Sequence, residues 1–516
     1  MGSNIIRTFV PTWIAFLPII AGVLLWFAGL GSSKIRDVIS IVFTAFIFLA
    51  VVTLYPAIKA GQTLFSYFQF FSFPLAITFK VDYLSFYLGL LISFIWFLAA
   101  FYSPGYMAGE GAKNRYYSFL LFAEGGCLGT VFAGDLLGLF LFFEFMALTS
   151  YVLVIHDEKP QSMFAGAKYL YMTIGGGLAI FFGMIIIYHL AGSINFTRAG
   201  LIGEASNLSL AAFIALVLGF GLKAGMFPVH IWLPDAHPAA PSPVSALLSG
   251  VMIKTGIYGI IRVFFNIYGL AFFQNVEWTK ILLAISAVTI LLGSALALLQ
   301  DDLKRRLAYS SITQIGYIIL GISLLTERSL TGGLYHIFTH AFLKGLLFFC
   351  AGAIIVQTGK RKISEMEGIG LQMPLTMIFF SIASITIIGI PPFNGFISKW
   401  QLCLAALEAE QPLFVVVLIA SSLLNAAYYF PVIITAFFSK RTTGERKPYL
   451  KSNFIAVSGP PAVPENTLNS DQPSRQEAPW HMLLPMAVLA TGCVIFALLP
   501  VNWPLKLVKA TVHILF

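Results

Sequence analysis

Residues 221–262, GLKAGMFPVHIWLPDAHPAAPSPVSALLSGVMIKTGIYGIIR, decide the fold. The stretch is apolar, but Pro228 and Pro234 interrupt it, and a Pro-rich loop separates its two halves. Lys223 and Lys254 fall where the hydrocarbon of a membrane is expected. A bare ammonium group there costs roughly 2.5–3.5 kcal/mol on insertion scales, and a broken helix persists at that depth only where protein or water shelters it. We therefore predict a functional site at this break; the alternative is a lysine that reaches the interface from a helix end.

The composition places the whole chain in a membrane. Of its 516 residues, 58% are hydrophobic and only 10% are charged, whereas average proteins carry about 25% charged residues. The net charge of +9 could indicate nucleic-acid binding, but the basic residues lie in short loops between apolar spans. The positive-inside rule explains them more simply, so the expected partner is the lipid bilayer and not a nucleic acid.

The sequence shows no sign of a cofactor. The four cysteines lie inside apolar spans, and no two of them have the spacing of metal or cluster ligands. The chain also lacks a dinucleotide fingerprint, a phosphate-binding loop and a haem-attachment motif. We therefore expect no cofactor, no metal and no catalytic chemistry in this chain itself, and an ATP-driven pump is disfavoured.

Hydropathy predicts an all-α polytopic membrane protein with about 14 transmembrane helices, because about 20 apolar residues suffice to cross a bilayer. The first apolar run lacks a signal-peptide cleavage pattern and is expected to remain as a span. The expected spans are residues 11–31, 37–57, 82–103, 115–133, 136–155, 163–191, 208–231, 241–268, 280–299, 304–325, 329–355, 374–405, 412–439 and 482–503.

The basic residues of the loops predict the orientation. The side that holds the loop between the first two spans carries about 17 Lys and Arg residues, and the side that holds both termini carries about 9. Positive charge accumulates on the cytoplasmic side, so we expect a multi-pass protein of the cell (inner) membrane with both termini outside. Residues 61–81 are expected to form an external loop, with a hairpin as one option. Residues 440–480 are expected to form a flexible cytoplasmic loop.

Two proline-broken spans indicate an internal repeat. The seventh expected span breaks at Pro228 and the twelfth at Pro391–Pro392, with Lys223 and Lys399 nearby. Each is the fourth span of a block of five, and successive blocks of five have opposite orientations. Such pairs are typical of inverted-repeat transporters with a mid-membrane site; coincidence is the alternative, because proline is common in membrane helices. The expected organisation is residues 1–110 (helices 1–3), 111–270 (first repeat, helices 4–8), 271–440 (second repeat, helices 9–13), 441–480 (cytoplasmic loop) and 481–516 (helix 14 and the C-terminus).

Glu144 is the only central ionisable group of the fifth expected span, DLLGLFLFFEFMALTSYVLV. A buried carboxylate needs a partner or becomes neutral, and Lys223 is the natural partner. The pair would have two useful states: both groups are charged while paired, and the lysine tends to release its proton when the pair opens. A permanent ion pair is the structural alternative, but such pairs contribute little stability, so we favour a switchable proton site.

The eleventh expected span carries His336, His340 and Lys344 at intervals of four residues, which places them in one stripe on a helix. Histidine titrates near neutral pH and can pass protons along a hydrogen-bonded line. The stripe is therefore predicted to be a proton wire, with hydroxyls such as Thr339 and waters filling its gaps. Two histidines at this spacing could instead bind a metal, but no carboxylate or cysteine ligand lies close in the sequence.

Further charges extend this row. Lys254 would lie between the two repeats and Lys399 after the second break, so that the lysines and the stripe form a polar row across the middle of the protein. Glu124 in the fourth span could tune the Glu144–Lys223 pair, bind a cation or pair with a polar neighbour.

Other polar groups lie near span ends. Asp135 is expected to cap a helix N-terminus, and Lys168 to reach the cytoplasmic interface. His230, Asp235 and His237 adjoin the connection between the seventh and eighth spans, where they serve either proton uptake or loop structure. Gly175–Gly177 are expected to allow close helix packing and carry no chemistry.

At this point the motifs resemble a known family. The segments FPVHIWLPDAHPAAPSPVSALLSGVMIKTGIYGIIR, LFFEFMALTSYVLV, KRRLAYSSITQIGYIILGI, HIFTHAFLKGLLF and GIPPFNGFISKW are similar to those of the proton-pumping antiporter-like membrane subunits. These subunits occur in respiratory complex I, in the multisubunit Mrp Na⁺/H⁺ antiporters and in membrane-bound hydrogenases. The resemblance covers roughly residues 80–440.

The resemblance implies a fold and residue roles. The family fold has fourteen core helices with inverted repeats over helices 4–8 and 9–13. Glu144 and Lys223 match the family's ion pair, Lys254 its central lysine and Lys399 its terminal lysine; His336 and His340 match its connecting histidines. Glu124 and the HDEK turn at 156–159 match no family pattern.

The expected function is proton translocation by a subunit of a larger membrane complex, driven by redox chemistry in partner subunits or by a sodium gradient. The segments DLLGLFLFFEF and FISKWQL favour the Mrp and membrane-bound hydrogenase branches of the family over complex I proper. Expected partners are further antiporter-like or small hydrophobic subunits, and iron–sulfur or hydrogenase-like peripheral subunits in the redox-driven case; the transported ions are protons, with Na⁺ as an open option. The alternatives are a quinone-facing scaffold of an oxidoreductase, as in complex I, or a standalone cation/H⁺ transporter.

Overall fold

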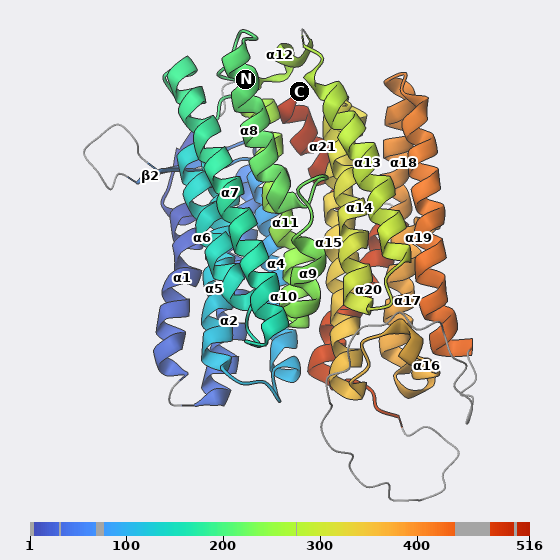
Figure 1. Ribbon diagram of the computed structural model, residues 1–516. Helices are drawn as coiled ribbons and strands as arrows, with labels where there is room; N and C mark the ends of the chain where they lie inside the picture. The colour runs from blue at the N-terminus through green and yellow to red at the C-terminus, as the bar shows by residue number, and fades with distance from the viewer. Residues whose placement is uncertain (1–4, 30–31, 69–76, 275, 439–474, 500–502) are drawn as a thin grey trace, which may run out of the picture.

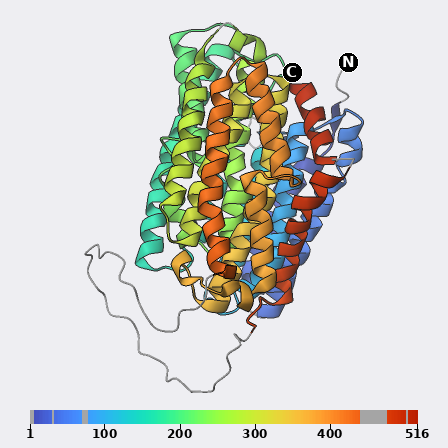
Figure 2. The same ribbon diagram turned by 90° about the vertical axis from the view of Figure 1, so that its right-hand side faces the viewer.

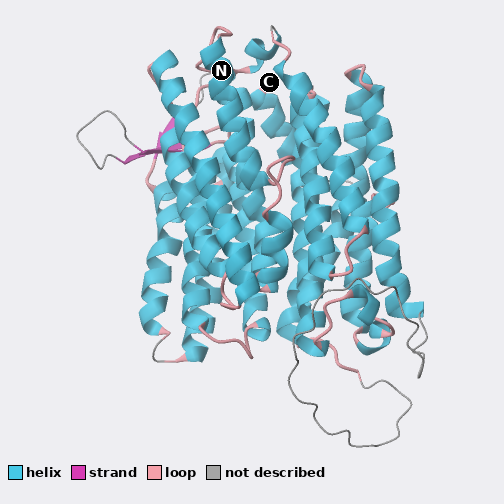
Figure 3. Ribbon diagram, in the orientation of Figure 1, coloured by secondary structure: helices cyan, strands magenta, loops and turns pink. Residues whose placement is uncertain are grey.

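The computed structural model describes residues 5–29, 32–68, 77–274, 276–438, 475–499 and 503–516. The expected cytoplasmic loop at 440–480 falls mostly outside these residues. Helices dominate the described chain and stand side by side in one bundle (Figure 3). Figure 1 shows α1, α2 and α5–α8 in one half of the bundle and α13, α14 and α16–α19 in the other, with α11 and α15 between them.

The elements of the first half come from residues 5–274. The strands are β1 (Ile5–Arg7), β2 (Thr63–Phe68) and β3 (Ile77–Val81). The helices are α1 (Val10–Ala28), α2 (Ser33–Val52), α3 (Tyr55–Lys59), α4 (Tyr83–Tyr106), α5 (Lys113–Phe132), α6 (Leu136–Val154), α7 (Pro160–Ala191), α8 (Asn207–Ala224), α9 (Leu233–Ala239), α10 (Ser242–Leu247), the π-helix η1 (Leu248–Met252), α11 (Ile253–Arg262), the π-helix η2 (Val263–Tyr268) and α12 (Leu270–Gln274).

The named elements among the described residues of the second half are all helices. Its elements are α13 (Trp278–Leu298), α14 (Leu303–Ser323), α15 (Glu327–Thr358), the 3₁₀ helix η3 (Ile363–Glu365), α16 (Ile369–Gln372), α17 (Pro374–Ile388), α18 (Asn394–Glu408), α19 (Pro412–Phe438), α20 (Trp480–Leu498) and α21 (Trp503–Leu515). Viewed at 90° to Figure 1, the long helices remain roughly parallel, which is the arrangement of a bundle that crosses a membrane (Figure 2).

Eleven helices of the described residues are long and apolar enough to cross a membrane. The other expected spans coincide with α5, α14 and the α17–α18 pair. The first two carry polar residues inside the helix, and α17 is short because the span is interrupted. The protein is thus a mostly helical membrane protein, and the exact count of fourteen stays a prediction.

The two proline-broken spans are interrupted earlier than the sequence indicated. α8 ends at Ala224, where Gly225 adopts a left-handed conformation (φ +84°), three residues before Pro228. α17 ends at Ile388, and Gly389 (φ +91°) precedes Pro391–Pro392 in the same way. Glycine adopts this conformation without a Cβ clash and therefore closes a helix readily, so each glycine, and not the proline, ends its helix.

The expected external loop at 61–81 contains part of a small sheet. β2 pairs antiparallel with β3, and β1 adds to β2 in parallel. Asp135 then fixes the sheet to α6: it caps the helix by accepting a hydrogen bond from Gly138 N (2.6 Å) and also accepts one from Thr78 N (2.8 Å). The predicted capping role of Asp135 is confirmed.

Two spans occupy the centre of the bundle. The segment Ser242–Tyr268, which includes α10, η1, α11 and η2, and the helix α15 are the most buried of the eleven spans. α15 packs against α10, α14, α17 and α18. Lys254 and the α15 stripe of the predicted polar row therefore lie on the two elements that have the least contact with lipid.

Candidate ion-translocation site

Four buried lysines define the site. Lys223, Lys254 and Lys344 are almost completely buried, and Lys399 is 7% exposed. They come from α8, α11, α15 and α18. No carboxylate among the described residues lies within ion-pair distance of any of the four. Their charges are instead met by carbonyl and hydroxyl oxygens and by aromatic rings.

Lys223 donates a hydrogen bond to the hydroxyl of Tyr169 on α7 and does not pair with Glu144. Its Nζ also lies 4.9 Å from the Tyr169 ring centroid, in the range of cation–π attraction. The Tyr169 hydroxyl is hydrogen-bonded to Ser150 Oγ at 2.6 Å, so the contact continues to α6. The predicted Glu144–Lys223 ion pair is therefore wrong for this conformation.

Glu144 points toward α7 because Gly177 leaves room for its carboxyl group. A Cβ at Gly177 would lie 2.6 Å from the Glu144 carboxyl carbon. Glu144 Oε1 is buried and has no hydrogen-bond partner, although the carboxylate remains within electrostatic range of Lys223. Gly177 thus does more than allow helix packing: its lack of a side chain leaves the space that the Glu144 carboxyl group occupies.

Lys254 lies directly after the π-helix η1, a type of turn that is frequent at functional sites. Its Nζ donates to the carbonyl of Ser249 within that turn. The Ser249 hydroxyl in turn meets Ser311 Oγ of α14 at 2.6 Å. Lys254 is also within electrostatic range of Lys344 and of His340, which places it at the junction between the two halves.

The predicted stripe on α15 is present and fully buried. The rings of His336 and His340 are parallel (5°), with centroids 6.1 Å apart. Lys344 Nζ donates to Leu307 O (2.9 Å) and to the Tyr429 hydroxyl (3.3 Å). Neither nitrogen of His340 has a hydrogen-bond partner among the described residues. Thr339 donates to its own helix, so it does not bridge the stripe as expected.

His336 has partners that suit both of its protonation states. Its Nε2 lies 3.0 Å from Gln314 Oε1, and its Nδ1 lies 2.9 Å from Ser398 Oγ. The Ser398 hydroxyl has a second acceptor, Gly395 O, at 3.0 Å. With Gln314 Oε1 accepting from Nε2, the imidazole is neutral when the Ser398 hydroxyl donates to Nδ1. When that hydroxyl donates to Gly395 O and accepts from Nδ1 instead, the ring carries both hydrogens and is charged.

Lys399 uses the carbonyl groups that the end of α17 leaves free. Its Nζ donates to Ile387 O (2.8 Å) and Ile388 O (3.0 Å). The last carbonyls of a helix lack intrahelical partners and carry partial negative charge. The ammonium group also faces the Tyr317 ring at 5.0 Å, and that ring meets His336 edge-on at 5.3 Å. Tyr317 therefore connects Lys399 to the stripe.

The predicted accessory groups separate into three sets. Lys168 forms an ion pair with Asp235 (2.7 Å), which Arg305 joins at 3.2 Å, so Lys168 does not simply reach the interface. Glu124 is fully buried, and neither carboxyl oxygen has a hydrogen-bond partner, which contradicts pairing with a polar neighbour. His230 and His237 are buried beside the connection between α8 and α10, and His237 stacks on Phe348.

A polar cavity opens below this connection. Its main part has a volume of about 820 Å³, and Asp157, Lys159 and Arg361 line both this part and a smaller extension. The extension reaches Lys304, whose Nζ donates to Ala240 O. His237 lies within electrostatic range of Lys304, Lys344 and Lys254. The cavity therefore reaches Lys304, and His237 lies between the charge of Lys304 and those of the central lysines.

His156 also lines the smaller extension of the cavity. Burial and the Arg115 charge lower the pKa of His156 below its ordinary value. No group of three or more His, Cys, Asp or Glu side chains that could hold a metal occurs among the described residues.

The sequence matches a defined family over most of this site. Residues 133–425 match the family described as "NADH:quinone oxidoreductase/Mrp antiporter, TM", and residues 67–117 match "NADH-Ubiquinone oxidoreductase (complex I), chain 5 N-terminus". The chain belongs to this antiporter-like subunit family. The resemblance inferred from the five motifs is thus confirmed.

Relatives of this antiporter-like subunit come from different complexes. It is 35% identical over 444 residues to "NADH-quinone oxidoreductase subunit N" of Desulforudis audaxviator, covering 82% of each chain. It is 33% identical to "Hydrogenase-4 component B" of Escherichia coli, covering 82% of this chain and 62% of that one. A solved structure of the Mrp complex from Dietzia sp. contains a similar fold (TM-score 0.85, 24% identity, covering 98% of this chain and 97% of that one). The protein is an antiporter-like subunit of a multisubunit membrane complex; the branch stays a prediction.

Several polar residues of the antiporter-like subunit's site escaped the sequence analysis. The main ones are Tyr169, Gln314, Tyr317 and Ser398. They lie on α7, α14 and α18 and meet their lysine or histidine partners only across helix contacts. A polar residue inside an expected span was the available signal, but serine and tyrosine are common there and the signal alone did not distinguish them.

Proposed function

We propose that this subunit carries protons across the membrane through Lys223, Lys254, the α15 stripe and Lys399. The observation that best supports this proposal is that four buried lysines have no carboxylate at ion-pair distance among the described residues. Without a counter-ion in a medium of low dielectric, the charged and neutral forms of a lysine are closer in free energy than in water. Each lysine can therefore accept a proton and pass it on.

The proposed route has two entries, one beside Glu144 and Lys223, which leads to Lys254, and one at the polar cavity. Protons reach Lys304 and His237 from the cavity and pass to Lys254 and Lys344, which His340 adjoins. His336 then transfers a proton as the Ser398 hydroxyl turns between its two acceptors. The proton leaves beside Lys399, where Tyr317 and the free carbonyls of α17 hold the ammonium group.

Glu144 controls Lys223 in this proposal. With the carboxylate beside Gly177, Lys223 is bound only to the Tyr169 hydroxyl, which favours release of its proton. Movement of Glu144 toward α8 would form the ion pair and keep the lysine charged. Glu124, buried and unpaired, is proposed to hold a proton and to influence this switch.

We also propose the orientation and the internal repeat. Fourteen helices would include two inverted blocks, helices 4–8 and 9–13, in the cell membrane with both termini outside and the polar cavity in the cytoplasm. The local geometry supports the repeat. Gly225 N donates to Gly221 O and Leu222 O, and Gly389 N donates to Ile385 O and Thr386 O, at the same intervals along the two helices.

The test uses the whole complex purified in mild detergent and reconstituted in liposomes that contain a pH-sensitive dye. Lys254→Met is expected to abolish proton uptake or release while leaving subunit assembly unchanged. Lys280→Met, an exposed lysine on α13, is the matched control. Full translocation by the Lys254→Met complex would assign conduction to another subunit and leave this chain a scaffold.

The driving force is tested in the same vesicles. Iron–sulfur or hydrogenase-like partners in the purified complex, with proton movement upon addition of an electron donor and acceptor, would support redox coupling. Proton movement driven by a Na⁺ gradient, with only small hydrophobic partners, would support Mrp-type exchange. In either case we propose that the chain itself holds no cofactor.

A further inference from the structure

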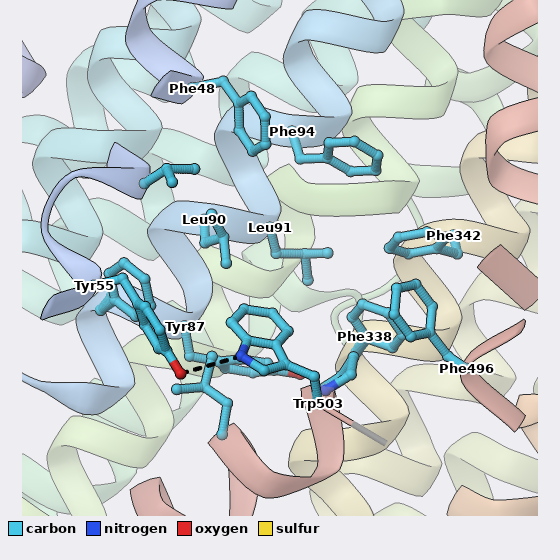
Figure 4. Close-up of a pocket in the computed structure, with 14 residues that line it drawn as sticks. Phe48, Tyr55, Tyr87, Leu90, Leu91, Phe94, Phe338, Phe342, Phe496 and Trp503 are labelled. Carbon is cyan, nitrogen blue, oxygen red and sulfur yellow. Dashed lines mark hydrogen bonds between the residues drawn. The ribbon is translucent and has the colours of Figure 1, made fainter. Parts of the chain in front are cut away.

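An apolar cavity of about 300 Å³ lies away from the lysine row, between α2, α4, α15, α20 and α21. Figure 4 shows Phe338, Phe342 and Phe496 on one side of it, with Leu90, Leu91 and Phe94 opposite. Its wall, formed by described residues, is entirely apolar. The two hydroxyl groups at its edge are occupied: the Tyr87 hydroxyl donates to Leu334 O (2.7 Å), and the Tyr55 hydroxyl accepts a hydrogen bond from Trp503 Nε1 (3.2 Å).

The cavity opens toward the outside of the bundle. Val52 and Trp503 at its mouth are 39% and 36% exposed, whereas Leu91 and Phe342 in its interior are 5% and 4% exposed. Because the chain lies in a bilayer, the surroundings of such an opening supply hydrocarbon. Water is a poor occupant because it needs two to four polar partners. A partner helix, about 10–12 Å in diameter, is too wide for a cavity of this volume. A single hydrocarbon chain fits.

The mouth has the features of a membrane–water interface and a positive charge. Tyr and Trp side chains concentrate at that interface, and here Tyr55 and Trp503 meet edge to face at 5.8 Å. One helical turn beyond them lie two exposed lysines, Lys59 on α3 and Lys506 on α21. Neither α3 nor α21 contains an acidic residue. A basic cluster of this kind attracts an anionic head group.

We propose that this cavity binds one acyl chain of an anionic phospholipid, whose phosphate lies between Lys59 and Lys506. The acyl chain fills the space between α4 and α15, and the Tyr55–Trp503 pair lies beside the glycerol level of the lipid. α21 packs directly against α4 and α15, and the bound lipid fills the space that remains between these helices and α2. This proposal does not depend on the proton route.

The test uses photolabelling of the purified complex in phosphatidylcholine vesicles. The probe is a phosphatidylglycerol with a diazirine near the methyl end of one acyl chain, and labelled peptides are identified by mass spectrometry. We expect adducts concentrated on the α4 segment around Leu91 and Phe94 and on the α15 segment around Phe338. Adducts spread evenly over lipid-facing helices, such as the outer face of α7, would overturn the proposal.

Two matched pairs of variants sharpen the result. Val52→Trp places a large side chain in the mouth and should remove most of the adducts, whereas Val42→Trp, exposed elsewhere on α2, should not. Neutralising both cations (Lys59→Gln with Lys506→Gln) should reduce the preference for phosphatidylglycerol over a phosphatidylcholine probe by up to about 30-fold, since each basic residue contributes roughly 1 kcal/mol. Lys34→Gln, at the other end of α2, is the control.

Three outcomes would contradict the proposal even if a variant fails to assemble. Equal labelling of the unmodified complex by the phosphatidylglycerol and phosphatidylcholine probes would show that the site does not select an anionic head group. Displacement of the probe by a long-chain quinone, and not by unlabelled phosphatidylglycerol, would assign the cavity to an isoprenoid tail. Absence of adducts on α4 and α15 would mean that a partner subunit closes the mouth.

Discussion

Gly256 on α11 packs directly against α8, the helix that carries Lys223. A Cβ at this position would lie 2.8 Å from the backbone N of Ala224, which follows Lys223, and would also clash with the Phe220 carbonyl. Ordinary contacts begin near 3.4 Å, so in Gly256→Ala the helices α8 and α11 must separate by at least roughly 0.6 Å, and by more at the Phe220 carbonyl, which is the nearer of the two atoms. Overpacking of this kind costs about 1–3 kcal/mol.

The matched control is Gly250→Ala in the same buried span. Its Cβ would meet nothing closer than 3.6 Å, and both substitutions gain a similar helix propensity, of at most about 1 kcal/mol. We expect thermal denaturation of the purified Gly256→Ala complex at a lower temperature than that of Gly250→Ala. We also expect at least about tenfold slower proton translocation, since a misplacement of about 1 Å can cost on the order of 100-fold. Equal stability and equal rates for the two variants would refute the idea that this contact sets the spacing of the two lysines.

Three further predictions follow from particular contacts. Ser398→Ala removes the hydroxyl that accommodates both states of His336. It should slow proton translocation in the liposome assay roughly 10- to 100-fold, as expected for loss of a hydrogen bond to a charged group. The control is Ser384→Ala, because the Ser384 hydroxyl bonds only to its own helix, and its translocation rate should equal that of wild type. Tyr169→Phe leaves Lys223 without its acceptor and should lower both rate and thermal stability, whereas Tyr171→Phe, 74% exposed on the same helix, should behave as wild type. Asp82, which precedes α4, forms an ion pair with the buried Arg262 at 2.8 Å. Burial disfavours the ionised carboxylate, but the Arg262 charge outweighs this and holds the pKa of Asp82 well below its ordinary value. The ion pair therefore stabilises the fold fully above about pH 4, and this stabilisation is lost as pH falls through the folded pKa. Asp82→Asn should therefore cost about 3–5 kcal/mol near neutral pH by leaving Arg262 buried and unpaired, and a denaturation midpoint equal to that of wild type would contradict the pairing.

Local patterns were enough to predict the membrane-spanning class and several site residues. Spans follow from runs of apolar residues, and the α15 stripe follows from a spacing of four residues on a helix. Lys223, Lys254 and Lys399 stood out because an ammonium group in hydrocarbon is costly wherever it occurs. These inferences need only the order of residues along one helix, which the chain carries in full.

The direction of each side chain and the identity of its partner required the tertiary structure. Glu144 and Lys223 were the obvious ion pair by charge, yet Gly177 on a third helix gives the carboxylate another place to lie, and Tyr169 takes the lysine. Gln314 and Ser398 reach His336 from helices 22 and 62 residues away in the chain. The apolar cavity beside α21 likewise depends on five helices meeting imperfectly. Such contacts depend on how the helices pack against one another. Packing is driven by apolar surfaces, so the sequence of a single span does not reveal which polar atoms of two helices will meet.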